Sequence, residues 1–349
     1  MSWKSDYATK ILILMSILLI MLIVWMIATD ENGPISDDKW TFVVMCDTRG
    51  NDSNYTGKTG INDAVLKEMA FAIAKEKCKL VLVPGDMVNG YWANNSVSYA
   101  DQFKKWNETM RPLYDAKIKV YTTRGNHEYG NYANYDVYPY NLTLDTALER
   151  AYLNEFADDN PDSGPQDEKD LTYNFSYNNA LFIGLDVYAN NHSHRVNQEW
   201  LDDVLEKNNK THIFVFGHEP AFKVNHNDSL AVYPAERDAF WDSIGQAGCR
   251  VYFCGHDHFY NRALIKDSAG NEIRQMLVGS CGAPFKPWIP YGSNGSSRFI
   301  CEHHNARDYG YALVTVDGEN ATVEWKSWDG SGEPKWIIED RFTIAALDI

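Results

Sequence analysis

Short apolar segments alternate with amphipathic helical patterns between residues 40 and 254, and this alternation restricts the possible folds more than any other feature of the chain. Trp40–Cys46 and Leu80–Val83 are apolar almost throughout and too short for helices, which predicts buried strands. Asn62–Lys77 and Tyr99–Leu113 place apolar side chains near the 3.6-residue spacing of an α-helix. Strands that alternate with helices in this way indicate an α/β fold.

The same patterns continue along the rest of the chain. They predict strands at Ile118–Thr122, Leu171–Tyr177, Ala180–Leu185, His212–Phe216, Arg250–Cys254, Ala263–Ile265, Arg274–Val278, Tyr311–Val316, Ala321–Trp325 and Trp336–Ile338, and helices at Gln198–Lys207 and Ala235–Gln246. The second and third of these strands are expected to form a hairpin across Asn178-Asn179. Residues 282–349 are mostly β, and they either complete the main domain or form a small appended module.

Five of the predicted strands stop at polar residues that can bind a ligand. These residues are Asp47; Asp86; Asn126, His127 and Glu128; His218; and His256 and His258. Ligands bind beyond the carboxyl ends of strands in open α/β sheets, so the five endings can meet in space. A glycine stands directly before four of them, where the chain must turn sharply or let another group come close.

These side chains offer oxygen and nitrogen ligands without thiolates, a set that suits Zn²⁺, Mn²⁺ or iron. A single aspartate at a strand end is more often a turn residue or a helix N-cap. Five such endings in one chain favour a metal site instead. Asp86, in the middle of the series, can bridge two ions. Two ions about 3.5–4 Å apart can bind a phosphate ester, produce a hydroxide near neutral pH and stabilise an in-line displacement.

The order of these motifs resembles the calcineurin-like metallophosphoesterases, whose pattern is D-x-(H/R), G-D-x-x-N, G-N-H-(D/E), a single His and G-H-x-H. The sequence GHDHFYNR at residues 255–262 is most similar to the purple acid phosphatase-like branch of that family. The resemblance extends over roughly residues 41–282. It implies an α/β (α+β) fold, a four-layer α/β/β/α sandwich of two mixed β-sheets.

The resemblance also implies a role for each residue of the site. Asp47 and His258 would hold the first of two divalent or trivalent ions, and Asp86 would bridge both. The second ion would be held by Asn126, His218 and His256. His127 would lie beside the leaving-group oxygen as phosphate contact or general acid, and Glu128 would orient it.

The chain departs from the family pattern at the first metal. Arg49 stands where the family usually has a histidine ligand, and arginine is permanently charged and cannot coordinate a cation. Asn89 stands where purple acid phosphatases have a tyrosine ligand, with Tyr91 as a conceivable replacement. The first ion is therefore expected to be weakly held, coordinated largely by water, or absent under some conditions. Arg49 either clamps substrate phosphate or forms an outward salt bridge.

The N-terminal region differs in kind from the rest. Residues 11–28 form an apolar stretch of 18 residues, which as a helix would be about 27 Å long and close to the ~30 Å bilayer core. Lys4 and Lys10 precede it, and an acidic linker at residues 29–38 follows. The positive-inside rule places residues 1–10 in the cytoplasm and residues 39–349, the catalytic domain, outside. A cleaved signal peptide is the alternative to this transmembrane signal anchor.

The distribution of glycosylation sequons also favours a location of residues 39–349 outside the cytoplasm. Eleven Asn-x-Ser/Thr sites occur, all after the apolar stretch, at Asn51, Asn54, Asn94, Asn107, Asn141, Asn174, Asn191, Asn209, Asn227, Asn294 and Asn320. They predict a glycoprotein that carries N-glycans. The net charge of -16 argues against nucleic acid as a partner.

Together these features predict a membrane-anchored, single-pass metallophosphoesterase with an extracytoplasmic site. The expected reaction is hydrolysis of a phosphomonoester, with a phosphorylated small molecule as substrate and a metal-bound hydroxide as nucleophile. One alternative is a phosphodiesterase that acts on cyclic nucleotides or surface phosphodiesters. Another is a non-catalytic metal-binding surface glycoprotein, which the incomplete ligand set of the first metal keeps open.

Overall fold

The computed structural model describes residues 39–50, 59–92, 97–134, 141–189, 193–287 and 298–346. The predicted transmembrane segment at residues 11–28 and the linker at residues 29–38 lie outside these ranges. So do five of the sequons, at Asn51, Asn54, Asn94, Asn191 and Asn294. Within the ranges that are described, no helix is long and apolar enough to cross a membrane.

The first of two large sheets contains six strands in the order β15-β14-β13-β1-β2-β3. Its parallel part consists of β1 (Trp40–Val44), β2 (Leu80–Val83) and β3 (Lys119–Thr122). Its antiparallel part consists of β13 (Tyr309–Asp317), β14 (Asn320–Trp328) and β15 (Ile337–Ala345). Because β13 pairs with β1, the C-terminal strands extend the same sheet that opens the domain.

The second sheet contains seven strands in the order β12-β10-β11-β9-β8-β7-β6. These are β6 (Tyr173–Tyr177), β7 (Ala180–Leu185), β8 (His212–Gly217), β9 (Val251–Cys254), β10 (Tyr260–Lys266), β11 (Glu272–Val278) and β12 (Phe299–Asn305). Four neighbours, β7, β8, β9 and β11, run parallel. The antiparallel pairing of β6 with β7 confirms the predicted hairpin, and Asn178 adopts the left-handed conformation (φ 48°) that its turn requires.

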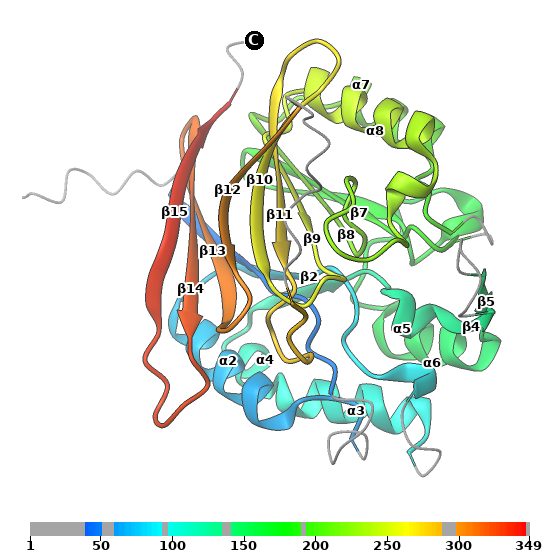
Figure 1. The fold of residues 1–349 in the computed structure, drawn as a ribbon, viewed down its shortest axis with the longest axis vertical. Helices are drawn as coiled ribbons and strands as arrows, with labels where there is room; N and C mark the ends of the chain where they lie inside the picture. Colours follow the sequence, from blue (N-terminus) through cyan, green and yellow to red (C-terminus); the bar gives the residue numbers. More distant parts are fainter. Residues whose placement is uncertain are drawn as a thin grey trace, which may run out of the picture. The chain divides into compact units, whose positions relative to one another are not determined.

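Aromatic side chains join the two sheets face to face. The ring of Phe42 on β1 lies 5.1 Å from that of Phe182 and 4.8 Å from that of Phe214, both on the second sheet. Helices α2 (Asp63–Lys75), α3 (Tyr99–Thr109) and α4 (Arg111–Asp115) share the core of the first sheet. Helices α7 (Gln198–Glu206) and α8 (Pro234–Gln246) pack on the second (Figure 1). Two mixed sheets with helices confirm the predicted α/β class.

Several elements differ from the sequence prediction. The helix expected at Tyr99–Leu113 divides into α3 and α4, because Pro112 at the start of α4 has no N–H to continue the hydrogen-bond ladder. The pattern also missed β12, the short helix α5 (Asn126–Tyr129) and the hairpin of β4 (Gly130–Asn134) and β5 (Asn141–Leu144). Helix α6 (Thr146–Phe156), capped by the side chain of Asp145, was missed as well.

Candidate metal centre

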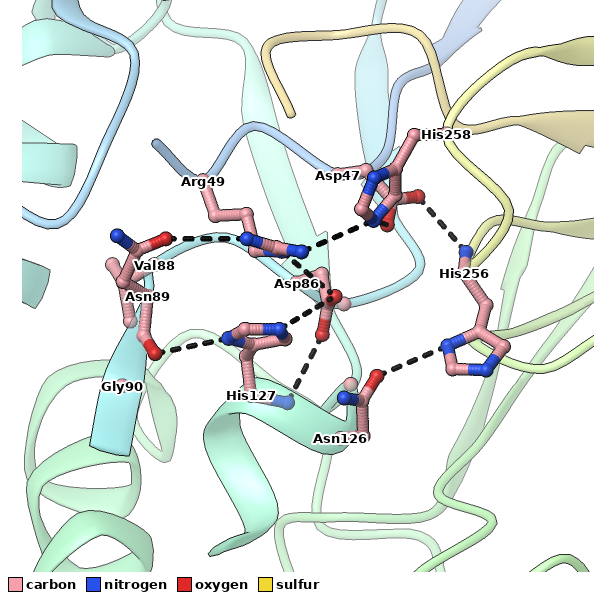
Figure 2. A network of polar contacts seen from close by, with 12 residues as sticks. Asp47, Arg49, Asp86, Val88, Asn89, Gly90, Asn126, His127, His256 and His258 are labelled. Atoms are coloured by element: carbon pink, nitrogen blue, oxygen red, sulfur yellow. Dashed lines mark hydrogen bonds and ion pairs between the residues drawn. The ribbon is translucent and has the colours of Figure 1, made fainter. Parts of the chain in front are cut away.

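The predicted ligands from both sheets converge at the carboxyl ends of their strands. Asp47 follows β1, Asp86 follows β2 and Asn126 follows β3, while His218 follows β8 and the His256–His258 segment follows β9. Figure 2 shows Asp47, Asp86, Asn126, His256 and His258 pointing toward one another. Each of the six side chains is at most 5% exposed. The structure therefore brings together all six side chains that the sequence proposed as ligands.

Glycines make this convergence possible. A Cβ atom on Gly255 would lie 2.2 Å from Asp47 Oδ2, and one on Gly125 would lie 2.2 Å from Asp86 Oδ1. Both contacts are far below any allowed separation, so only glycine lets each carboxylate approach the neighbouring loop. Asp47 and Asp86 themselves adopt positive φ angles of 58° and 51°. Such strained conformations in non-glycine residues cluster at functional sites.

Asp86, Asn126, His218 and His256 form one ligand set, which we call the Asn126 site. His218 Nε2 lies 3.1 Å from Asn126 Oδ1, 3.2 Å from His256 Nδ1 and 3.3 Å from Asp86 Oδ1. His256 Nδ1 lies 3.0 Å from Asn126 Oδ1. His218 Nε2 thus lies within 3.3 Å of a ligand atom of each of the other three side chains.

The outer contacts of the two histidines determine which ring nitrogen faces this cluster. His218 Nδ1 is 2.8 Å from the carbonyl oxygen of Pro84, so it carries the proton and leaves Nε2 as an acceptor. His256 Nε2 is 3.3 Å from Asp228 Oδ1, which leaves Nδ1 as the inward ligand atom. When a cation replaces the proton on Nδ1, all four inward atoms can coordinate it. The Asn126 site therefore fits a divalent ion, with its histidines fixed by outer partners as in known metal sites.

The pKa shifts of the two histidines follow from these contacts. Burial lowers the pKa of His218, so its ring is neutral and able to coordinate. Burial also acts to lower the pKa of His256, but the carboxylates of Asp228, Glu219 and Asp257 raise it to about 10. A proton on His256 and a metal ion thus compete for the same nitrogen.

Asp47, Asp86 and His258 form a second set, which we call the Asp47 site. Their ligand atoms all lie within 4.8 Å of one another, and His258 Nε2 is 3.7 Å from Asp47 Oδ1. Within the described part of the chain, Asp47 Oδ1 is buried without a hydrogen-bond partner. Burial and the nearby charge of Asp86 raise the pKa of Asp47 well above its usual value. Both observations indicate that the Asp47 site also fits a cation.

Arg49 points into the centre rather than outward, so the predicted alternative of an outward salt bridge is wrong. Its side chain is only 6% exposed. Its Nε lies 3.4 Å from Asp86 Oδ2 and its Nη2 lies 3.3 Å from His258 Nε2 (Figure 2). Tyr91, the conceivable replacement ligand, has an exposed side chain in the short helix Gly90–Trp92.

His127 and Glu128 lie on α5 (Asn126–Tyr129), next to Asp86. His127 Nδ1 is 2.9 Å from the carbonyl oxygen of Asn89, and its Nε2 is 3.9 Å from Asp86 Oδ2. Glu128 accepts hydrogen bonds from the backbone N–H groups of Asp86, Val88 and Gly125 at 2.8–3.0 Å. The Asn89 carbonyl therefore orients the ring of His127. Glu128 joins the loops after β2 and β3, a positioning role different from the one the sequence suggested.

Sequence reasoning missed His226, which the structure places against the centre. Its ring lies 4.6 Å from that of His256 and 6.1 Å from that of His258. Its Nδ1 is 2.6 Å from Asp257 Oδ1, and this carboxylate also accepts the backbone N–H groups of Asn225 and His226. His226 lies in an irregular loop after His218, and no period or strand ending marks it. Its closeness in sequence to His218 was the only signal that could have drawn attention to it.

A carboxylate shared by two buried ligand sets, next to a histidine and an arginine, gives a centre whose side chains can hold divalent ions. The family model for calcineurin-like phosphoesterases matches residues 51–260. The chain belongs to this family. The predicted resemblance is thereby confirmed. Curated protein sequences give no match to the chain.

Solved structures share the fold. The purple acid phosphatase PPD1 from yellow lupin (Lupinus luteus) seeds superposes with a TM-score of 0.64 at 16% identity. This match covers 88% of the chain but only 54% of the lupin protein, so the chain spans about half the length of that relative. A dimetal phosphatase from Danio rerio superposes with a TM-score of 0.52 at 17% identity, over 88% of this chain and 99% of the fish protein.

Proposed function

We propose that the protein hydrolyses phosphate monoesters of small molecules at a centre that takes two divalent ions. The observation that carries this proposal is the pair of ligand sets that share Asp86, with His127 beside it. Bound ions would polarise the phosphoryl group and supply a nucleophile from water near neutral pH. Mixed oxygen and nitrogen ligands favour Zn²⁺, Mn²⁺ or iron.

His127 is the proposed general acid. Its Nδ1 donates to the Asn89 carbonyl, so the protonation state of Nε2 decides whether the ring can give a proton to a leaving group. The ring is buried next to Asp86, where a positioned histidine can act on the departing oxygen. The Asn89 carbonyl holds the ring in place, which reduces the reorganisation that proton transfer would otherwise require.

The proposed location is outside the cytoplasm, with the chain held at the membrane by residues 11–28. The excess of sequons supports this, and two of those in the described residues, Asn209 and Asn320, have exposed side chains accessible to a glycan. A mass shift on enzymatic removal of N-glycans from the protein in its native host checks it. A chain without glycans, recovered from the cytoplasm, would contradict the proposed location.

The reaction is tested with the full-length protein in mild detergent, stripped of metal and assayed on p-nitrophenyl phosphate and its bis-ester. Re-addition of Mn²⁺ or Zn²⁺ is expected to restore cleavage of the monoester in preference to the diester. Preference for the bis-ester would indicate a phosphodiesterase. Cleavage of neither ester would favour a non-catalytic metal-binding glycoprotein.

A single substitution separates catalysis from metal binding. His127→Ala is expected to lower turnover by about 10²–10⁴-fold with metal content unchanged, because it removes the acid but no ligand. The matched control is His212→Gln at the opposite end of β8, where His212 Nε2 contacts the carbonyl of Gly318. Unchanged turnover in His127→Ala would remove His127 from the mechanism.

A further inference from the structure

We propose that the guanidinium of Arg49 and the first metal ion compete for the same ligand atoms. In this view the resting centre holds one tightly bound ion, at the Asn126 site, and a fixed side-chain cation at the Asp47 site. A second ion enters only by displacing Arg49. The inference rests on the metal-dependent function proposed above. It specifies which cations occupy the two ligand sets.

The contacts of Arg49 coincide with the ligands of the Asp47 site. Of the three ligand residues, Asp86 and His258 both present their inward atoms to the guanidinium, at 3.4 Å from Nε and 3.3 Å from Nη2. Nη1 is held by the carbonyl oxygen of Gly50 at 3.2 Å and by Asn89 Oδ1 at 3.4 Å. Figure 2 shows the guanidinium lying between Asn89 on one side and His258 on the other.

The hydrogen bond between His258 and Pro284 makes the competition exclusive. His258 Nδ1 lies 2.8 Å from the carbonyl oxygen of Pro284, so the ring proton is on Nδ1 and Nε2 has a single lone pair. That lone pair accepts from the Nη2 group of Arg49. It cannot bind an ion at the same time.

Moving Arg49 out of the centre would also cost free energy. Its guanidinium cannot lose its charge, and the side chain is almost completely buried. Its backbone N–H is fixed to the carbonyl oxygen of Asp86 at 3.1 Å, and the residue forms a bridge with Ile61. An ion at the Asp47 site would therefore have to offset both the lost contacts of a buried cation and the repulsion between two positive charges.

The Asn126 site has no such competitor. Among the described residues, no Lys or Arg contact to Asn126, His218 or His256 is found, and His218 Nε2 lies within 3.3 Å of a ligand atom of each of the other three residues. The two sites thus differ in kind although they share Asp86. One is prepared for a metal ion, while the other is already occupied in part by a guanidinium, whose planar fork also suits phosphate oxygens.

Metal stoichiometry tests this difference directly. The full-length protein, stripped and then loaded with Mn²⁺, is desalted and its metal content measured. Calorimetric titration gives the affinities. Wild type is expected to retain one ion per chain. Arg49→His, which supplies the ligand usual in the family, is expected to retain two. Arg49→Met removes the competitor without adding a ligand and is expected to bind the second ion about tenfold or more tightly than wild type.

Magnetic coupling provides a second readout that does not depend on activity. After loading with two equivalents of Mn²⁺ and desalting, wild type is expected to give the electron paramagnetic resonance spectrum of an isolated ion, and Arg49→His that of a coupled pair. Arg111→His, an exchange at an exposed arginine paired with Asp115, is the control and should match wild type.

Two outcomes would overturn the proposal. The first is a wild type that binds two ions with equal affinity. The second is a pair of folded variants, Arg49→His and Arg49→Met, in which second-ion binding is unchanged. If one variant fails to fold, the other still decides. One ion per chain without any esterase activity would refute the proposed function but not this inference, so the two failures can be told apart.

Discussion

Asp47 and Asp340 are both buried aspartates near an arginine, but their surroundings differ. Both oxygens of the Asp340 carboxylate accept hydrogen bonds from side-chain donors, whereas Asp47 Oδ1 has no hydrogen-bond partner among the described residues. Asp340 on β15 accepts from Arg262 Nε at 2.7 Å, from Arg262 Nη2 at 2.9 Å and from the Tyr260 hydroxyl at 2.6 Å. Arg262 also contacts Glu302, which accepts from Arg274 Nε at 2.9 Å. In this Arg262 cluster every named charge has a partner of opposite sign.

Among the described residues of the metal centre, hydrogen-bond acceptors outnumber the donors that could satisfy them. Asp47 Oδ1 and His218 Nε2 are inward acceptors, and the pKa of Asp47 is raised by burial and by Asp86. Burial also acts to raise the pKa of Asp340, but the hydrogen bonds from Arg262 and Tyr260 lower it overall. The comparison teaches that a buried charge alone does not mark a functional site. The mark is a surplus of acceptors that the protein's own donors do not satisfy.

The largest expected effect comes from the carboxylate shared by both ligand sets. Asp86→Asn removes the negative charge that both sites use, so the metal is lost together with the several kcal/mol by which bound ions stabilise the transition state. Turnover is then expected to fall by about a thousandfold or more. Parallel metal analysis and ester assays check this. Retained metal with normal turnover would show that Asp86 is not needed for metal binding, and the proposed difference between the two regions would be wrong.

The next effect is on stability and concerns the Arg262 cluster. Asp340→Ala leaves the guanidinium of Arg262 buried without its main partner, which is expected to cost about 3–5 kcal/mol in the free energy of unfolding. Urea unfolding measures it, with metal content expected to stay unchanged. The control is Asp115→Ala, which removes an exposed pair with Arg111 and is expected to cost no more than about 1 kcal/mol. Equal losses in both variants would contradict the assignment.

Removal of metal by a chelator should lower the stability of the metal centre and leave the Arg262 cluster unaffected. An ion bound to the native state at a free concentration of 100 times its dissociation constant adds about 2.7 kcal/mol of stability, which a chelator removes. Wild type and Asp340→Ala are expected to lose the same amount, whereas Asp86→Asn should lose almost none. A chelator effect that persists in Asp86→Asn would place the stabilising ion elsewhere in the protein.

The smallest effect is a pH dependence of the Arg262 cluster. Because the pKa of Asp340 is lowered below its usual 3.8, the native state binds fewer protons than the unfolded chain. The contribution of Asp340 is therefore fully present above about pH 4 and is lost as the pH falls through the lowered value. The stability difference between wild type and Asp340→Asn should shrink over that range. A stability difference that grows on acidification would mean that the pKa of Asp340 is raised, not lowered, in the folded protein.

The strand endings were predictable because each is local: a polar residue follows an apolar run, and in four of the five cases a glycine stands directly before it. The hairpin across Asn178-Asn179 and the ligands from Asp47 to His258 were found in this way. The direction of Arg49 was not predictable, because it depends on Asn89 and His258, which are distant in the sequence. The same holds for His226, whose place is fixed by Asp257 and not by any repeating pattern.

The most direct test of the metal centre is anomalous X-ray diffraction from crystals of the full-length protein loaded with Mn²⁺. A strong anomalous peak is expected between Asp86 Oδ1, Asn126 Oδ1, His218 Nε2 and His256 Nδ1, because His218 Nε2 lies within 3.3 Å of each of the other three atoms. If these four side chains keep their positions and the map shows no peak between them, the strand endings do not form a metal centre.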